Sequence, residues 1–194
     1  PIATAIVAAS AAHGQPLFKT IDSLEWMAAD SKVIVHASIS DVVREAAEGN
    51  NVWDTVTVKV HHTLKGEHQD TLKFAVTHYL PSSKDEDRLN RWKDTADELL
   101  LFLVDSKHQR KFDDKYLAHE LALRTADWWG WSVVRLGPRQ ERRDFTQDVF
   151  TLDFKVIEDP KEILHATKTA VAEAAKSKNV RKHQVRLPRD VAKK

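Results

Sequence analysis

The sequence predicts a mainly β domain of the α+β class: a small antiparallel, OB-like barrel with a short helix before it and a longer helix after it. Three observations predict this fold. Apolar and polar residues alternate over several short segments, as in half-buried strands. A helix-start pattern precedes the first of these segments, and a second one follows the last. The number and spacing of the strands between the two helices favour a closed or nearly closed barrel.

The chain begins with an uncharged segment of small and apolar residues, IATAIVAASAA at positions 2–12. It is too short to cross a bilayer, which takes roughly 20 residues. It fits the apolar part of a secretory signal, and Ala9-Ser10-Ala11 matches the A-x-A cleavage pattern. We therefore expect residues 1–12 to be the remnant of a signal peptide and the domain to be exported. The alternative is an ordinary buried N-terminal helix.

The barrel domain is expected to span residues 22–157 and to begin with a short helix. Asp22 is the expected N-cap residue, and Glu25, three residues later, completes a capping box. This helix is expected to end near Asp30. The period then changes to two, and VIVHASI at positions 33–39 predicts a strand with both faces partly covered.

The clearest pattern is that of a long antiparallel hairpin. Apolar and polar side chains alternate over residues 53–64 and again over residues 71–77. With a turn centred near residues 67–68, His62 is expected to lie opposite Phe74. One face of the hairpin is expected to point into the core, and it comprises Val56, Val58, Val60, His62, Leu64, Leu72, Phe74 and Val76.

The second half of the domain mixes charged segments with short strands. Residues 82–96 are charged and predict a surface helix or loop. The continuous apolar run LLLFLV at positions 99–104 predicts a buried central strand. Three further strands are expected within residues 116–123, 131–136 and 149–157.

A packed C-terminal helix is expected over residues 159–177. Asp159 is the expected N-cap residue, Pro160 occupies the first helical position, and Glu162 the third. The apolar residues that follow recur at helical spacing and supply one buried stripe, made of Ile163, Ala166, Ala170, Val171 and Ala174.

The end of the chain is basic. Residues 176–194 hold 8 Lys or Arg and 1 Asp, a charge of +7, while the remainder holds 22 basic and 28 acidic residues, a charge of −6. We expect residues 178–194 to form a basic tail, either a solvated extension or a segment that binds nucleic acid or anionic envelope polymers by charge neutralisation. The tail has no aromatic residue for base stacking, so no specific nucleic-acid partner is expected.

A family resemblance lies between Ser23 and Val104. The segments SLEWMAADS, KVIVHASI, TVTVKVHHTLKG, DTLKFAV and ELLLFLV follow one another there. In this order they resemble the netrin-module, or tissue-inhibitor-of-metalloproteinase, type of OB barrel, and more closely the exported bacterial domains of unassigned function that share this layout. The eukaryotic inhibitors depend on an N-terminal cysteine and several disulfides. This chain has no cysteine, so the resemblance does not imply protease inhibition.

Most catalytic and metal motifs are missing. The lack of cysteine excludes thiolate metal sites and cysteine nucleophiles, and neither a Gly-rich phosphate loop nor a G-x-S-x-G elbow occurs. His61 and His62 are adjacent in a predicted strand, so they are expected to point to opposite faces and not to share one ion. His119-Glu120 begins a zinc-protease motif, but Leu123 stands where its second histidine belongs. We therefore expect no metal, no cofactor and no legible catalytic residue.

Trp128, Trp129 and Trp131 surround Gly130 and are the most unusual local feature. They form either an aromatic platform for a sugar or a peptide, or a set of rings of which two cap the barrel core. The sequence therefore favours an exported, non-catalytic barrel that has no transmembrane segment. This barrel is expected to bind a protein or polysaccharide partner through these tryptophans. The alternative is a hydrolase-type enzyme whose site is assembled from residues far apart in the sequence.

Overall fold

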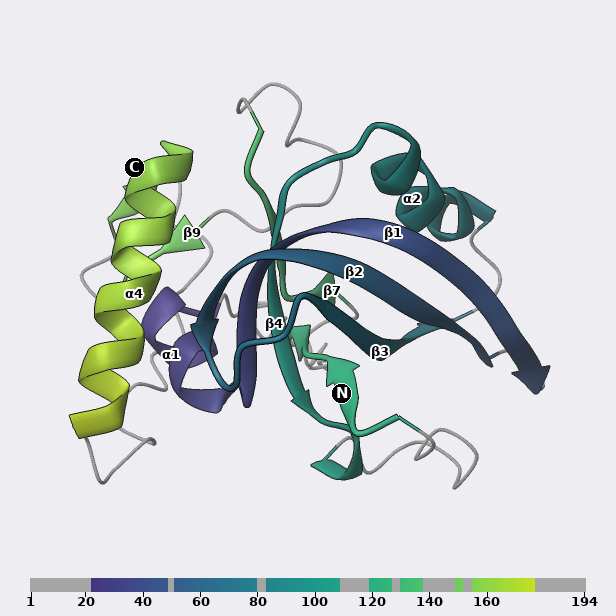
Figure 1. Cartoon of the computed structure of the whole chain (residues 1–194), viewed down its shortest axis with the longest axis horizontal. Coiled ribbons are helices and arrows are strands. Elements are labelled where there is room, and N and C mark those ends of the chain that lie inside the picture. Colours follow the sequence, from purple (N-terminus) through teal and green to yellow (C-terminus); the bar gives the residue numbers. More distant parts are fainter. Residues whose placement is uncertain are drawn as a thin grey trace, which may run out of the picture.

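The computed structural model confirms the predicted fold class. The described elements form a closed five-stranded barrel, with one helix before it in the chain and another after it (Figure 1). The structure describes residues 22–48, 51–79, 83–108, 119–126, 130–137, 149–151 and 155–176. The expected signal remnant, residues 1–12, and the basic tail, residues 178–194, lie outside these ranges. None of the described helices is both long enough and apolar enough to pass through a membrane.

The described elements follow one another in the order α1 (Leu24–Asp30), β1 (Val33–Glu48), β2 (Asn51–Lys65), β3 (Thr71–Tyr79), α2 (Ser83–Asp94), β4 (Leu99–Asp105), the 3-10 helix η1 (Ser106–His108), β5 (Leu121–Leu123), β6 (Thr125–Ala126), β7 (Gly130–Trp131), β8 (Val133–Arg135), β9 (Val149–Phe150), β10 (Val156–Ile157) and α4 (Pro160–Lys176).

The barrel closes through β1 and β4. The strand order is β1-β2-β3-β5-β4, and β4 pairs with β1 to complete the ring. The other edge of β4 pairs with β5 and, nearer its start, with β8. The pairing of β3 with β5 is parallel, whereas the sequence predicted an antiparallel barrel throughout. In a closed ring with an odd number of strands the directions cannot alternate all the way round, so one neighbouring pair must be parallel.

The predicted buried strand is confirmed in β4, which has a core on each face. Leu99, Leu101 and Leu103 point into the barrel together with the alternating residues of β1, β2 and β3. Leu100 and Phe102 point the other way, into a second core between the barrel wall and the helices. Because both faces are buried, the run of apolar residues has no polar interruption.

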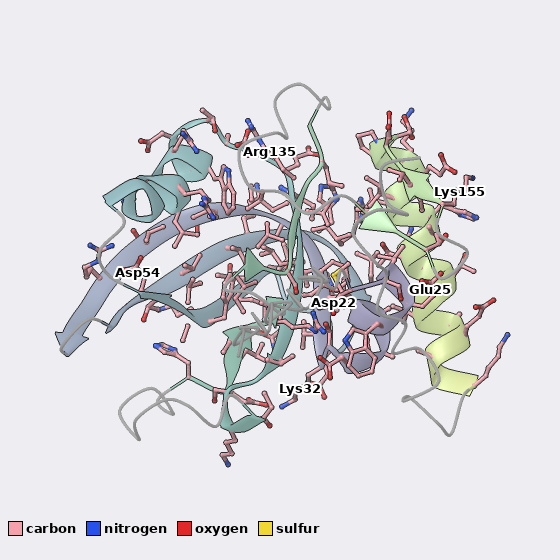
Figure 2. The ribbon with its side chains drawn as sticks, turned by 180° about the vertical axis from the view of Figure 1, so that it is seen from behind. Asp22, Glu25, Lys32, Asp54, Arg135 and Lys155 are labelled. Carbon is pink, nitrogen blue, oxygen red and sulfur yellow. The ribbon has the colours of Figure 1, made fainter. Side chains whose placement is uncertain are left out.

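The second core is covered by α1 and α4, which pack side by side on one flank of the barrel (Figures 1 and 2). The predicted start of α4 is confirmed: Asp159 Oδ1 accepts hydrogen bonds from the backbone of Lys161 and Glu162, both at 2.9 Å. The predicted cap of α1 is wrong by one residue. Ser23 is the N-cap, with Oγ accepting from the Trp26 backbone nitrogen at 3.1 Å, and Asp22 is engaged elsewhere.

Helix α2 caps one end of the barrel, on the side away from α1 and α4 (Figure 1). The sequence predicted a surface helix or loop over residues 82–96. Leu89 and Trp92, three residues apart on one face of the helix, are instead buried in the same core as the barrel strands. The segment is so rich in charged residues that its one buried face was not predicted.

The hairpin β2–β3 exists, but its predicted register is wrong. Val56, not His62, lies opposite Phe74. The predicted inward residues Val56, Val58, Val60, Leu72, Phe74 and Val76 are all buried. His62 is exposed, and Leu64 packs on the second core instead. The last residues of β2 pair with β1 alone, and a β-bulge there changes which side chains share a face.

Two predicted strands are also shorter or divided. The expected strand at 116–123 is described only as β5, and the expected strand at 149–157 is two short strands, β9 and β10, that pair with each other. The expected strand at 131–136 matches β7 and β8, interrupted at Ser132.

Candidate functional site

The tryptophan cluster falls on a small hairpin between β5 and β8. Strands β6 and β7 pair through Thr125 with Trp131, so Trp131 itself belongs to a strand. Trp128 and Trp129 come between these two strands in the chain and lie outside the described residues. The role of these tryptophans in binding stays a prediction.

The base of this hairpin is fixed to the barrel. Arg124 precedes β6 and Ser132 follows β7, and the Ser132 amide donates to the Arg124 carbonyl at 2.9 Å. The Arg124 amide donates to the Phe102 carbonyl at 2.9 Å, and the Phe102 amide donates to the Ser132 carbonyl at 3.2 Å. Phe102 lies in β4, so the hairpin starts and ends on a strand that is buried on both faces.

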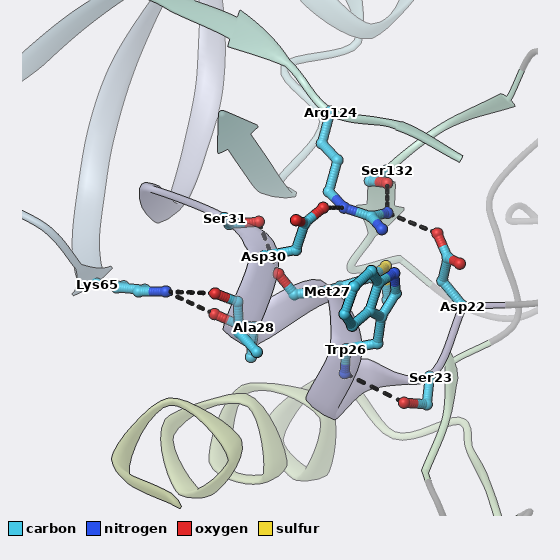
Figure 3. A network of polar contacts seen from close by, with 11 residues as sticks. Asp22, Ser23, Trp26, Met27, Ala28, Asp30, Ser31, Lys65, Arg124 and Ser132 are labelled. Carbon is cyan, nitrogen blue, oxygen red and sulfur yellow. Dashed lines mark hydrogen bonds and ion pairs between the residues drawn. The ribbon is translucent and has the colours of Figure 1, made fainter. Parts of the chain in front are cut away.

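The Arg124 side chain joins that base to helix α1 (Figure 3). Its Nη1 donates to Asp22 Oδ2 at 2.6 Å and to Ser132 Oγ at 2.9 Å, and its Nε donates to Asp30 Oδ2 at 2.6 Å. The guanidinium also lies 5.9 Å from the centre of the Trp26 ring. Arg124 is buried, and it bridges carboxylates at the two ends of α1. We call this group the Arg124 clamp.

The C-terminal end of α1 has a second attachment, from β2. Lys65 Nζ donates to the carbonyl oxygens of Ala28 and Ala29, at 2.8 and 3.2 Å (Figure 3). These carbonyls have no partner within the helix, and a cation there also interacts favourably with the helix dipole. Burial lowers the pKa of Lys65, an effect that nearby Asp30 opposes. Helix α1 is thus held at both ends, and Arg124 links it to the base of the hairpin.

A second candidate surface is the outer face of β2 and β3. Thr57, Lys59 and His61 alternate with the barrel-facing valines of β2, and Thr71 and Lys73 occupy the same outer face of β3. Lys59, His61, Thr71 and Lys73 are exposed. Among the described elements, α1 and α4 cover the second core, where α4 also contacts β2 and Leu64 packs, and α2 covers one end of the barrel. The part of this face that carries these four residues is polar, cationic and exposed.

Three histidines meet at one end of this face, contrary to the prediction that His61 and His62 point to opposite faces. In the β1–β2 register, His36 lies opposite His62 and Ala37 lies opposite Val60, so His61 is an extra residue in β2. Such a bulge turns two successive side chains toward the same side. The ring centres of His61 and His62 accordingly lie 5.2 and 5.6 Å from that of His36.

Two polar contacts complete this histidine cluster. Glu98 Oε2 lies 3.1 Å from His36 Nε2, and Ser38 Oγ lies 3.1 Å from His61 Nε2. The pKa of His36 is lowered, chiefly by burial and further by His61 and His62, while Glu98 acts in the opposite direction. This cluster could not be predicted, because its residues come from three segments and the bulge that brings them together has no sequence pattern of its own.

The described contacts of these groups do not form a nucleophile–base–carboxylate triad. Ser38 and His61 resemble a nucleophile and its base, but the carboxylate at hand, Glu98, contacts His36 and not His61. A nucleophile–base pair needs a third group that orients the base. Over the described ranges, no three His, Asp or Glu side chains are arranged to hold a metal ion. His119, from the incomplete zinc-protease motif, instead contacts Thr55 Oγ1 at 2.9 Å.

Comparisons of the chain with protein-family models, with curated proteins and with solved structures give no significant match.

Proposed function

We propose that this chain is an exported, non-catalytic β-barrel domain that binds a protein or polymer partner. The observation that carries the proposal is the outer face of β2 and β3, which is polar and exposed at Lys59, Thr71 and Lys73. OB-type barrels bind oligosaccharides and oligonucleotides on this part of the barrel. Export is supported by the signal-like pattern of residues 2–12. Membership in the netrin-module type of barrel is supported by the order of segments between Ser23 and Val104.

The charge on this face favours an anionic polymer. Lys59 pairs with Thr71, and Thr57 pairs with Lys73, so the two lysines are diagonal neighbours on adjacent strands. Diagonal neighbours are about 7–8 Å apart. Two ammonium groups at this spacing, flanked by threonine hydroxyls, suit an extended chain that carries acidic groups and hydroxyls.

We expect dextran sulfate, used as a probe of acidic polysaccharides, to bind this face. The double variant Lys59→Glu/Lys73→Glu should bind about tenfold more weakly at low salt, because two exposed attractions become repulsions. Fluorescence anisotropy with a labelled probe measures the affinity, and added salt should weaken binding by the unchanged protein. The matched control is Lys161→Glu/Lys168→Glu, which makes the same charge change on the exposed side of α4. Equal losses in both double variants would show that only net charge matters.

The tryptophan hairpin is the alternative candidate surface, favoured by the hydrogen bonds that tie its base to β4 and to the Arg124 clamp. We expect a neutral oligosaccharide, the hexamer of N-acetylglucosamine, to change the tryptophan fluorescence. Replacement of the accessible one among Trp128, Trp129 and Trp131 by Ala should weaken binding by about 30-fold, since an aromatic anchor contributes about 2 kcal/mol. Acrylamide quenching and melting curves of the three single variants identify the accessible ring. If all three replacements unfold the domain, the cluster is core and this surface is excluded.

A further inference from the structure

The histidine cluster lies on the seam that closes the barrel. His36 lies within the part of β1 that pairs with β4, which runs from Val33 with Leu103 to Ala37 with Leu99. It lies opposite Leu100 on one side and opposite His62 on the other. Its partner Glu98 stands directly before β4. The contacts of this one imidazole therefore join β1, β2 and the start of β4.

The surroundings of His36 accept a neutral ring and disfavour a charged one. Its side chain is 9% exposed. With Nε2 directed at the Glu98 carboxylate, Nε2 is the nitrogen that carries the proton in the neutral ring. Nδ1 is buried and has no hydrogen-bond partner in the described structure. Protonation would place a second N–H there without an acceptor, which is unfavourable in a buried site.

The neighbouring charges add to this effect. His61 and His62 contact the His36 ring and are themselves exposed, so protonation brings positive charges together. Glu98 is the acidic group that faces the cluster, and its side chain is 61% exposed, so solvent screens its attraction. The other close contacts are uncharged: Ser38 beside His61 and Leu100 across the seam.

We propose that this histidine cluster is an acid-sensitive latch: the barrel seam between β1 and β4 is closed while His36 is neutral and opens when His36 is protonated. The direction follows from the lowered pKa of His36. The unfolded or opened chain binds this proton more tightly, with an ordinary imidazole pKa of about 6.5. The stability contributed by neutral His36 is fully present above that pH and is lost as the pH falls toward the lower pKa of the closed state.

Hydrogen exchange of the full chain tests the latch, at about pH 7.5 and about pH 5, after correction for the intrinsic exchange rate. We expect protection of residues 33–37 and 99–103 to fall at the lower pH, because the opened chain binds the His36 proton more tightly than the closed barrel does. Protection of the paired residues 54–59 and 71–76 of the β2–β3 hairpin should fall much less. Equal loss in the seam and in the hairpin would overturn the proposal, because the barrel would then respond as a whole.

His36→Gln removes the titrating group while keeping an amide N–H that can reach Glu98, and its seam should be protected equally at both pH values. The matched control is His165→Gln on the exposed side of α4, which should behave as the unchanged protein. If His36→Gln does not fold, an NMR titration of His36 in the unchanged chain decides. His36 should titrate below about 6.5, and lower still in Glu98→Gln, which loses the attraction that raises its pKa. Titration at or above that value overturns the latch.

Discussion

Replacement of Trp92 by alanine is expected to lower the free energy of unfolding by about 3–5 kcal/mol. The side chain is 3% exposed and belongs to the core inside the barrel, although it comes from a helix that is otherwise highly charged. Its removal leaves a large cavity where α2 closes the barrel end, and the surrounding strands cannot collapse to fill it. Urea denaturation followed by far-UV circular dichroism measures the change.

The matched control is Arg91→Ala, next to Trp92 but on the exposed side of the same helix. It is expected to change stability by no more than about 0.5 kcal/mol. Leu89→Ala, which removes the other buried residue of α2, should cost about 2–5 kcal/mol. If Trp92→Ala costs no more than Arg91→Ala, α2 does not cap the core and the helix belongs to the surface, as its composition suggests.

Much of the fold was predictable because it depends on local patterns. Alternation identified the strands β1, β2 and β3, and the uninterrupted run of β4 identified a strand buried on both faces. The start of α4 depends on Asp159 and the residues directly after it, so a short stretch of sequence is enough to predict where the helix begins. These features are set by neighbours within one element.

The strand register was not predictable because it depends on residues in other strands. Shifting β3 along β2 leaves the alternation of each strand unchanged, so the pattern cannot distinguish one register from another. The turn after Lys65 suggested the wrong one, because the last residues of β2 run past the end of β3 to pair with β1. The bulge at His61 adds one residue to β2 and interrupts the alternation of inward and outward side chains. His62 was therefore predicted to lie inside the barrel, but it is exposed.

The candidate site was the least predictable part for a related reason. The tryptophans stand out in the sequence, but the residues that hold their hairpin do not. Arg124 bonds to Asp22 across 102 positions of the chain and to Asp30 across 94 positions. A single arginine among many charged residues carries no signal of burial, and only the packing of α1 against β4 removes it from water.

Replacement of Arg124 by methionine is expected to lower the free energy of unfolding by about 3–5 kcal/mol, the range seen when one partner of a buried ion pair is removed. The cost arises mainly at Asp22, whose carboxylate is buried and loses the guanidinium that lies 2.6 Å away. Asp30 contributes less, because 41% of its side chain is exposed and water can replace the lost contact. Thermal and urea denaturation measure the loss.

Two further variants separate the loss of the buried pair from a general effect of removing a cation. Lys155→Met breaks the exposed ion pair of Lys155 with Glu162, at 3.0 Å beside α4 (Figure 2), and should cost only about 0–1 kcal/mol. Asp22→Asn in the Arg124→Met background removes the stranded charge and should restore part of the stability, so the two changes are not additive. The clamp is refuted if Arg124→Met lowers the free energy of unfolding no more than Lys155→Met does. It is also refuted if the losses from Asp22→Asn and Arg124→Met simply add in the double variant. A higher stability of the double variant than of Arg124→Met would show that the base of the tryptophan hairpin depends on the Arg124–Asp22 ion pair. These two residues are far apart in the sequence and meet only in the folded chain.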